Sequence, residues 1–293
     1  MTDQIIDRIH ALPIWQGPVS PEPLSGGLSN QSFTVEDGAG RWVVRLGRDF
    51  PFHHVDRTRE VMVARAAAAA GFAPEVRHAE AGLTVSAFIE GRTYTEADVR
   101  RDRPRIAALL RRFHEEMPAQ VSGTAVLFWP FHVIRDYVRT LEAAQHRYCD
   151  RLTAWLALSA RLEAAQLPLP IRFGHNDLLP GNLIDDGERL WLVDFEYAAY
   201  TTAMSDLAGL ASNAGFDREA DQALLGEYFE APPDPLLVHA FGAMKCAALL
   251  REAMWSMVSE IHLDVPGVDY VAYSDENLDR LDMALAAWQA GAP

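Results

Sequence analysis

The length, composition and charge of the chain exclude several classes of protein. The chain has 293 residues, of which 49% are hydrophobic and 23% are charged, as in an ordinary globular protein with a sizeable core. The formal net charge of -15 would repel a phosphate backbone, so we expect no nucleic-acid partner. An acidic surface fits a cationic ligand, but it also keeps proteins in solution, and charge alone does not separate these two explanations.

The beginning of the chain and the cysteines predict a cytoplasmic protein. Residues 1–10 are polar and acidic, without the apolar core of a signal peptide, and no apolar run approaches the roughly 18 residues of a membrane span. Cys149 and Cys246 have neither metal-ligand nor C-x-x-C spacing, so we expect two buried thiols in a reducing compartment. No membrane partner is expected, and the sequence leaves open whether the protein is a monomer or a homodimer.

The first third of the chain predicts a small lobe of mixed structure. It begins with a helical pattern over residues 3–11, which a proline-rich segment ends. A second helix is expected over 57–70, where Gly71 stops it, and it stands between two pairs of strands. The expected strands cover 32–35, 41–46, 75–78 and 83–88.

From about residue 95 the pattern becomes mainly helical. The expected helices cover 98–116, 131–146, 150–164 and the region from about 204 to the end, with a compact loop and short strands at 171–194. We therefore predict an α+β fold of two lobes, a small mixed β/α N-terminal lobe over 1–88 and a larger, mainly helical C-terminal lobe over 89–293. The hinge between them is expected near 86–91.

One polar loop contains the residue types that phosphoryl transfer requires. Asp177 suits the carboxylate that orients a hydroxyl and accepts its proton, and Asn182 and Asp194 suit the oxygen ligands of magnesium. Asp177 and Asn182 have the spacing of the catalytic loop of protein kinases, and Asp194 precedes Phe195 as in the D-F-G motif. A strand–turn–strand pattern over 183–193 would bring both metal-binding ends together. Any one of these residues alone would indicate a turn, but the set indicates a kinase.

Two further polar residues near this loop are interpreted as structural. We expect His175 to be hydrogen-bonded within the loop rather than to carry protons. Asp206 begins a helical pattern, so we expect it to cap that helix or to brace the backbone of the loop.

The first lobe offers partners for the nucleotide. The turn at residues 25–30 includes Gly27, Ser29 and Asn30, whose backbone N–H groups suit phosphate oxygens. Arg45 lies on the strand where kinases keep a phosphate-binding lysine, and an ion pair with Glu60 would hold it in place, although a surface salt bridge is an equal alternative from these two residues alone. The one lysine of the chain is Lys245, and no G-x-x-x-x-G-K-[ST] loop occurs, which excludes an ordinary P-loop kinase.

In these residues the chain resembles the superfamily of choline/ethanolamine kinases and aminoglycoside phosphotransferases, and most closely its choline kinase branch. The similar segments, 43–46, 88–92, 175–182 and 194–200, spread the resemblance over nearly the whole chain. It implies a protein-kinase-like two-lobed fold, ATP and magnesium as cofactors, and a small cationic amino alcohol as the acceptor. It further implies that Arg45 replaces the strand lysine and that Phe88 at the hinge contacts the nucleotide.

The resemblance also indicates where the acceptor binds. The expected substrate-binding residues are Glu196, Tyr197, Glu252, Trp255 and Tyr270. Choline kinases usually carry two tryptophans three residues apart in the segment that resembles 252–256, and here Glu252 stands at the first of the two positions. A carboxylate there favours an ammonium that donates hydrogen bonds, such as that of ethanolamine. The aromatic residues also have the spacing of ordinary helix packing.

Two alternative functions stay open at this point. One is an aminoglycoside or other small-molecule kinase with the same catalytic groups. The other belongs to a different class, a nucleotide-binding regulatory protein that does not turn over. Intact Asp177, Asn182 and Asp194 argue against the second alternative.

Overall fold

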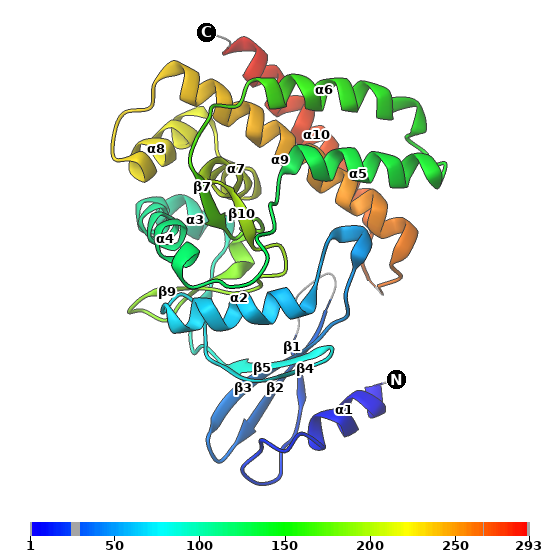
Figure 1. The fold of residues 1–293 in the computed structure, drawn as a ribbon, viewed down its shortest axis with the longest axis vertical. Helices are drawn as coiled ribbons and strands as arrows, with labels where there is room; N and C mark the ends of the chain where they lie inside the picture. Colours follow the sequence, from blue (N-terminus) through cyan, green and yellow to red (C-terminus); the bar gives the residue numbers. More distant parts are fainter. Residues whose placement is uncertain (1, 25–29, 266, 292–293) are drawn as a thin grey trace.

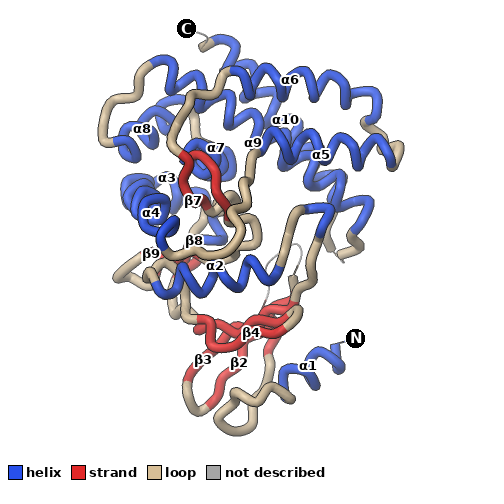
Figure 2. The backbone as a smooth tube through the Cα atoms, in the orientation of Figure 1, coloured by secondary structure: helices blue, strands red, loops and turns tan. Residues whose placement is uncertain are grey.

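The computed structural model describes residues 2–24, 30–265 and 267–291. A β-sheet lies at the end of the molecule that carries the N-terminus, and helices fill most of the remainder (Figure 1). Figure 2 shows the same division by type of structure, with the strands of the first lobe gathered below the helices. The predicted α+β class, with a small mixed part and a larger helical part, is confirmed.

The sheet of the first lobe is antiparallel and has five strands in the order β1-β2-β3-β5-β4. Their bounds are β1 Glu22–Leu24, β2 Gln31–Asp37, β3 Gly40–Leu46, β4 Val76–Glu80 and β5 Leu83–Ala87. The sequence analysis did not predict β1, a short exposed edge strand that contains Pro23 and shows no alternation of apolar residues.

The first lobe has a core of its own on one face of the sheet. Alternate residues of the strands, among them Phe33, Val35 and Val44, are buried against Ile9 of helix α1 (Thr2–His10). Because successive side chains of a strand point to opposite faces, Arg45 lies on the face opposite to Val44. This alternation directs the Arg45 guanidinium away from the first core and toward the rest of the molecule.

Helix α2 (Arg57–Ala69) runs between the sheet and the helical part of the molecule (Figure 1). Asp56 caps it by accepting hydrogen bonds from the backbone N–H groups of Thr58 and Arg59. Val63 and Ala67 are buried in the large core of the helical part rather than in the core of the sheet. A boundary between the lobes after residue 88 therefore stays a prediction, because α2 precedes that boundary but packs into the core of the helical part.

The remaining elements form the larger part of the molecule. Its helices are α3 Glu96–Arg101, α4 Arg103–Glu116, α5 Pro130–Ala143, α6 Leu152–Ala164, α7 Ala203–Asn213, α8 Arg218–Phe229, α9 Pro235–His262 and α10 Tyr270–Ala290. Its short strands are β6 Arg92–Thr93, β7 Ile171–Gly174, β8 Leu183–Asp185, β9 Leu190–Leu192 and β10 Ala199–Thr202. Helix α9 is central, because α5, α6, α7 and α10 all pack against it.

The structure corrects two details of the sequence analysis. The helix predicted over 98–116 is interrupted at Asp102, where α3 ends and α4 begins, because Pro104 in the first turn of α4 has no N–H to continue the earlier helix. Cys246 is buried as expected, but Cys149 is exposed, since it lies in a short 3-10 turn between α5 and α6. No helix in the described part of the chain is long and apolar enough to cross a membrane.

Candidate active site

A β-hairpin brings the predicted catalytic loop and the predicted metal aspartate together. Asn182 ends a 3-10 turn directly before β8, and Asp194 follows closely after β9, which pairs with β8 through Leu183 and Leu192. The backbone N–H of Val193 donates to the carbonyl of Asn182 at 3.1 Å. The expected strand–turn–strand arrangement is confirmed, and it places Asn182 and Asp194 at the same end of the hairpin.

Two residues of this site adopt left-handed backbone conformations. Asn176 has φ 62° and Asp194 has φ 68°. Asn and Asp tolerate this region better than most residues, because their short polar side chains hydrogen-bond locally. The side-chain amide of Asn176 donates to the carbonyls of Tyr197 and Ala199 at 3.2 and 3.4 Å, which ties the catalytic loop to the chain after Asp194.

Asp177 lies half-buried beside Asn182. The Asn182 side-chain amide donates to the backbone carbonyl of Asp177 at 2.8 Å. Burial, the negative charge of Glu252 and then that of Asp194 raise the pKa of the Asp177 carboxyl well above its ordinary value. A carboxylate with a raised pKa binds a proton more readily than a free one, which suits a group that accepts the proton of a hydroxyl.

Asp206 and His175 have the structural roles that the sequence analysis expected. The Asp206 carboxylate accepts hydrogen bonds from the backbone N–H groups of His175 and Asn176 at 2.8 and 2.6 Å, and from the ring of His114 at 2.8 Å. His175 is fully buried, and its Nε2 contacts the carbonyl of Val193 at 2.9 Å. Asp206 thus fixes the backbone of the predicted catalytic loop through these hydrogen bonds.

Arg45 of strand β3 contacts Asp194, the aspartate that is predicted to hold the metal. Its guanidinium donates to Glu60 and to Asp194, both at 2.7 Å. The predicted Arg45–Glu60 ion pair is therefore present, and it is largely buried rather than on the surface. Burial alone would lower the pKa of Arg45, but the neighbouring carboxylates, led by Asp194 and Glu60, outweigh it and raise the pKa. Arg45 therefore stays cationic beside Asp194 and Glu60.

Arg57 belongs to the same cluster, and the sequence analysis missed it. One of its guanidinium nitrogens donates to Glu60 at 2.6 Å and to Glu196 at 2.9 Å, and the other donates to the side-chain oxygen of Asn30 at 2.9 Å. Its position three residues before Glu60 on α2 was a usable signal, since residues at that spacing share a helix face. Through Asn30, the cluster reaches the end of the glycine turn.

Glu196 lies with the arginines rather than with the acceptor residues. The sequence analysis expected it to bind the acceptor, but its carboxylate contacts Arg45 at 3.2 Å and Arg57 at 2.9 Å. A buried carboxylate is stable beside two cations and costly elsewhere, which explains this placement. The structure therefore places Glu196 beside the two arginines, and its predicted part in binding the acceptor stays a prediction.

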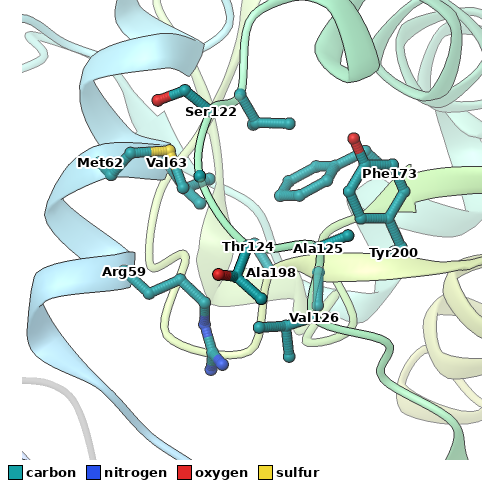
Figure 3. Close-up of a pocket in the computed structure, with 13 residues that line it drawn as sticks. Arg59, Met62, Val63, Ser122, Thr124, Ala125, Val126, Phe173, Ala198 and Tyr200 are labelled. Carbon is teal, nitrogen blue, oxygen red and sulfur yellow. The ribbon is translucent and has the colours of Figure 1, made fainter.

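Arg59 holds the backbone of the same segment. Its guanidinium donates to the carbonyl of His54 at 2.8 Å and to that of Glu196 at 3.3 Å. Figure 3 shows Arg59 at the edge of a pocket between α2, the chain at 121–126 and strands β7 and β10. No carboxylate lines this pocket, so it lacks the groups that phosphoryl transfer needs.

The other predicted nucleotide residues are placed less completely. Gly27 and Ser29 lie outside the described residues. Phe88 follows β5 in the connection between the lobes, where its N–H donates to the carbonyl of Arg41 at 2.9 Å and the Arg41 guanidinium lies 3.9 Å from the centre of its ring. Phe88 is therefore fixed at the predicted hinge, and the Arg41 guanidinium lies over its ring.

Four of the predicted acceptor residues do come together. The indole N–H of Trp255 on α9 donates to the hydroxyl of Tyr197 at 2.9 Å, and its ring lies 6.2 Å from that of Tyr270 on α10. Glu252 lies one turn before Trp255, and it accepts a hydrogen bond from the hydroxyl of Tyr273 at 2.9 Å. Aromatic rings and a carboxylate, the groups that attract an ammonium ion, thus occupy one region beside Asp177.

His53 supports this aromatic group from the segment before α2, and the sequence analysis did not identify it. Its ring stacks on that of Trp255 at 5.2 Å and 22°. Its two nitrogens contact the hydroxyls of Tyr137 and Ser259 at 3.0 and 2.8 Å. Burial, followed by the charge of Arg251, lowers the pKa of His53 to about 3, so the ring is neutral near pH 7. No pattern in the sequence near residue 53 indicates the contact with Ser259, which lies 206 positions later in the chain.

The oxygen atoms beside the arginine cluster fit a magnesium ion that is also held by phosphates. Among the described residues, the side-chain oxygen of Asn182 and the second carboxylate oxygen of Asp194 accept no hydrogen bond. Magnesium prefers such hard oxygens and takes only one or two ligands from protein in nucleotide sites. Within the described ranges, no group of three or more His, Cys, Asp or Glu residues forms a closed metal site.

Comparisons with known proteins connect this geometry to one family. The family model described as "Phosphotransferase enzyme family" matches residues 20–241. The chain is 25% identical over 297 residues to a probable ethanolamine kinase of Arabidopsis thaliana, covering 87% of this chain and 78% of that protein. It is 23% identical over 274 residues to Protein LicA of Haemophilus influenzae, covering 88% of this chain and 77% of LicA.

Solved structures share the fold over nearly the whole chain. A choline/ethanolamine kinase family protein from Mesorhizobium loti has a TM-score of 0.76 and 27% identity, covering 97% of this chain and 94% of that one. Choline kinase LicA from Streptococcus pneumoniae has a TM-score of 0.78 and 23% identity, covering 98% and 99%. The more distant spectinomycin phosphotransferase APH(9)-Ia has a TM-score of 0.63 and 12% identity, covering 97% of each chain. The predicted protein-kinase-like fold and superfamily resemblance are confirmed.

Proposed function

The chain belongs to the phosphotransferase enzyme family, and from this premise we propose that it is an ATP-dependent kinase that phosphorylates the hydroxyl of a small amino alcohol such as choline or ethanolamine. The names of its relatives, a probable ethanolamine kinase and a choline/ethanolamine kinase family protein, support this acceptor class. The acceptor residues beside Asp177, which combine aromatic rings with a carboxylate, have the chemistry that such an acceptor requires.

One observation carries the proposal. Arg45 of the sheet donates to Asp194 at 2.7 Å, and the same hairpin that presents Asp194 also presents Asn182 and, through it, Asp177. A cation for phosphate, two oxygen ligands for a metal and a carboxylate for the hydroxyl therefore lie around one point. These are the groups that phosphoryl transfer needs, because the protein itself performs little covalent chemistry in this reaction.

Each residue has a defined task in this mechanism. Asp177 accepts a hydrogen bond from the acceptor hydroxyl, holds its oxygen toward the phosphorus and takes its proton as the new P–O bond forms. Arg45, fixed by Glu60, contacts the phosphates of ATP, and ADP leaves with the former β–γ bridging oxygen. Asn182 and Asp194 would hold magnesium, which when bound neutralises the charge that develops on the phosphates. Alignment and charge neutralisation supply most of the rate enhancement.

The test is a screen of ADP release with magnesium and ATP. The acceptors are choline, ethanolamine, other amino alcohols and a set of aminoglycosides. We expect turnover with at least one small amino alcohol, and loss of that turnover in Asp177→Asn. Turnover with aminoglycosides alone would refute the acceptor class. ATP binding without transfer to any acceptor would refute the kinase assignment and favour a regulatory protein.

A further inference from the structure

Glu252 is a carboxylate among the aromatic residues of the predicted acceptor region, and the phosphoryl-transfer mechanism does not use it. It lies on α9 three residues before Trp255, a spacing that places both side chains on one face of the helix. One oxygen accepts the Tyr273 hydroxyl at 2.9 Å, and the other accepts a guanidinium N–H of Arg251 at 2.6 Å. The carboxylate is therefore held in one orientation from both sides.

Glu252 and Asp177 are two carboxylates whose negative charges repel each other. Among the charges that raise the pKa of the Asp177 carboxyl, that of Glu252 acts most strongly, and both side chains are half-buried. Arg251 forms an ion pair with Glu252 at 2.6 Å and acts against this repulsion, but the pKa of Asp177 stays raised. A cation that lies between the two carboxylates would relieve the remaining repulsion.

We infer, resting on the proposed function, that Glu252 selects acceptors whose ammonium carries at least one N–H, so that primary amino alcohols are preferred to quaternary ones. The acceptor hydroxyl faces Asp177, and the ammonium N–H groups donate to Glu252. Trp255 and Tyr197 supply aromatic faces, which attract any ammonium ion and so do not discriminate between its degrees of methylation.

The selectivity follows from what a methylated ammonium does to Glu252. A primary ammonium forms a charge-assisted hydrogen bond, which is shorter and roughly twice as strong as a neutral one. A quaternary ammonium has no donor, and its methyl groups separate the charges while they exclude water from the carboxylate. Glu252 then keeps its hydrogen bonds from Tyr273 and Arg251 but lacks the one from the acceptor, and the loss of one hydrogen bond to a charged group typically changes kcat/KM by about tenfold or more.

A purely structural role for Glu252 predicts a different result. If the carboxylate only neutralised Arg251, its removal would lower stability and activity toward every acceptor to the same extent. A role in selection changes the ratio of kcat/KM values between acceptors. The ratio is therefore the measurement that separates the two roles.

The experiment uses ethanolamine and its N-methyl, N,N-dimethyl and N,N,N-trimethyl derivatives, the last of which is choline. In the parent enzyme we expect kcat/KM for ethanolamine to exceed that for choline by about tenfold or more, with the largest drop at the final methyl group. In Glu252→Leu the preference should fall below about threefold. Glu252→Gln retains the shape and an acceptor oxygen, so it should fold like the parent and keep only part of the preference.

A matched control is Glu260→Gln on the same helix. Glu260 pairs with Arg147 and His146 rather than with the acceptor residues, so this variant should keep the parent's preference. Equal or greater kcat/KM for choline in the parent, or an unchanged preference in both Glu252 variants, would overturn the inference while leaving the proposed function intact. Failure of the parent to phosphorylate any of the four alcohols would instead refute the proposed function, and this inference with it.

Discussion

Arg45 and Asp194 are 149 positions apart in the sequence, yet Nη2 of Arg45 donates to Oδ1 of Asp194 at 2.7 Å. The first residue belongs to the sheet of the small lobe, and the second follows the hairpin of the large part. This contact joins the cation that we propose for phosphate binding to the carboxylate that we propose for metal binding. The Arg57–Glu60–Glu196 contacts surround it, so the two parts of the molecule meet through an ion-pair network.

The first prediction concerns the stability of that network. Arg57→Met removes a cation that contacts Glu60 and Glu196, leaving largely buried carboxylates with fewer partners. We expect a loss of about 3 kcal/mol in the free energy of unfolding, measured by urea denaturation. The control is Arg65→Met on the same helix, an exposed position where a change within about 0.5 kcal/mol is expected. Equal losses in the two variants would contradict the role given to Arg57.

The second prediction concerns the support of the catalytic loop. Asp206→Ala leaves the backbone N–H groups of His175 and Asn176 without their acceptor in a fully buried place. We expect a loss of about 3 to 5 kcal/mol in the free energy of unfolding. Asp279→Ala, at an exposed position of α10, should change it by less than about 0.5 kcal/mol. A loss below about 1 kcal/mol for Asp206→Ala would show that the loop is held by other contacts.

The same residue predicts a dependence of stability on pH. Burial alone would raise the pKa of Asp206, but hydrogen bonds from His114 and from the backbone outweigh it and lower the pKa. A lowered pKa in the folded state means that Asp206 stabilises the fold above the ordinary aspartate pKa of roughly 3.9, and that this stabilisation is lost as the pH falls through the lower value. The difference between the parent and Asp206→Ala should therefore shrink in acid. An equal difference at every pH would contradict this linkage.

The third prediction concerns the metal. Asn182→Ala removes a proposed oxygen ligand, and Asp194→Asn removes the negative charge of the other while it keeps one oxygen, so both should raise the magnesium concentration needed for half-maximal activity by about tenfold or more. Electron paramagnetic resonance of manganese, with ATP present, reports binding directly. Asp279→Asn serves as the control because Asp279 lies on the exposed face of α10. Unchanged metal affinity in both site variants would remove these residues from the metal site.

The fourth prediction concerns the pH–rate profile. Asp177 must be ionised to accept a proton, and burial and the charge of Glu252 raise its pKa. Activity should therefore fall as the pH drops, with a midpoint above the ordinary aspartate pKa of roughly 3.9. Removing the charge in Glu252→Gln should move this acid limb to lower pH, whereas Glu260→Gln should leave it in place. An acid limb that does not move would show that the Glu252 charge does not act on Asp177.

The sequence predicted the elements of the site better than their tertiary partners. The alternation of apolar residues in β2 and β3 and the spacing of Asp177, Asn182 and Asp194 depend on local pattern, and each was accessible from the chain alone. Glu196 and Tyr197 were both assigned to the acceptor because they follow Asp194 directly, but their side chains contact different groups, Arg57 and Trp255. The direction in which each of these side chains points depends on the backbone turn after Asp194, and the sequence does not define that turn.

Contacts between segments that are distant in the sequence were the hardest features of the site to predict. His53 reaches Ser259 and stacks on Trp255, and no periodic pattern near residue 53 indicates either contact. Strand β10 was missed for a similar reason, since it is short and exists through its pairing with β7. Propensity is a weak guide for such elements, because tertiary pairing stabilises them.

The central claim, that Asp177 accepts the proton of an amino alcohol during transfer from ATP, is tested most directly by detecting the product. Parent and Asp177→Asn are incubated with magnesium, ATP and ethanolamine, and the phosphorylated alcohol is quantified by mass spectrometry while ATP binding is measured in parallel. We predict product from the parent, and a rate lower by about 100-fold or more in the variant with ATP affinity retained. Equal rates of product formation in the two proteins would contradict the account.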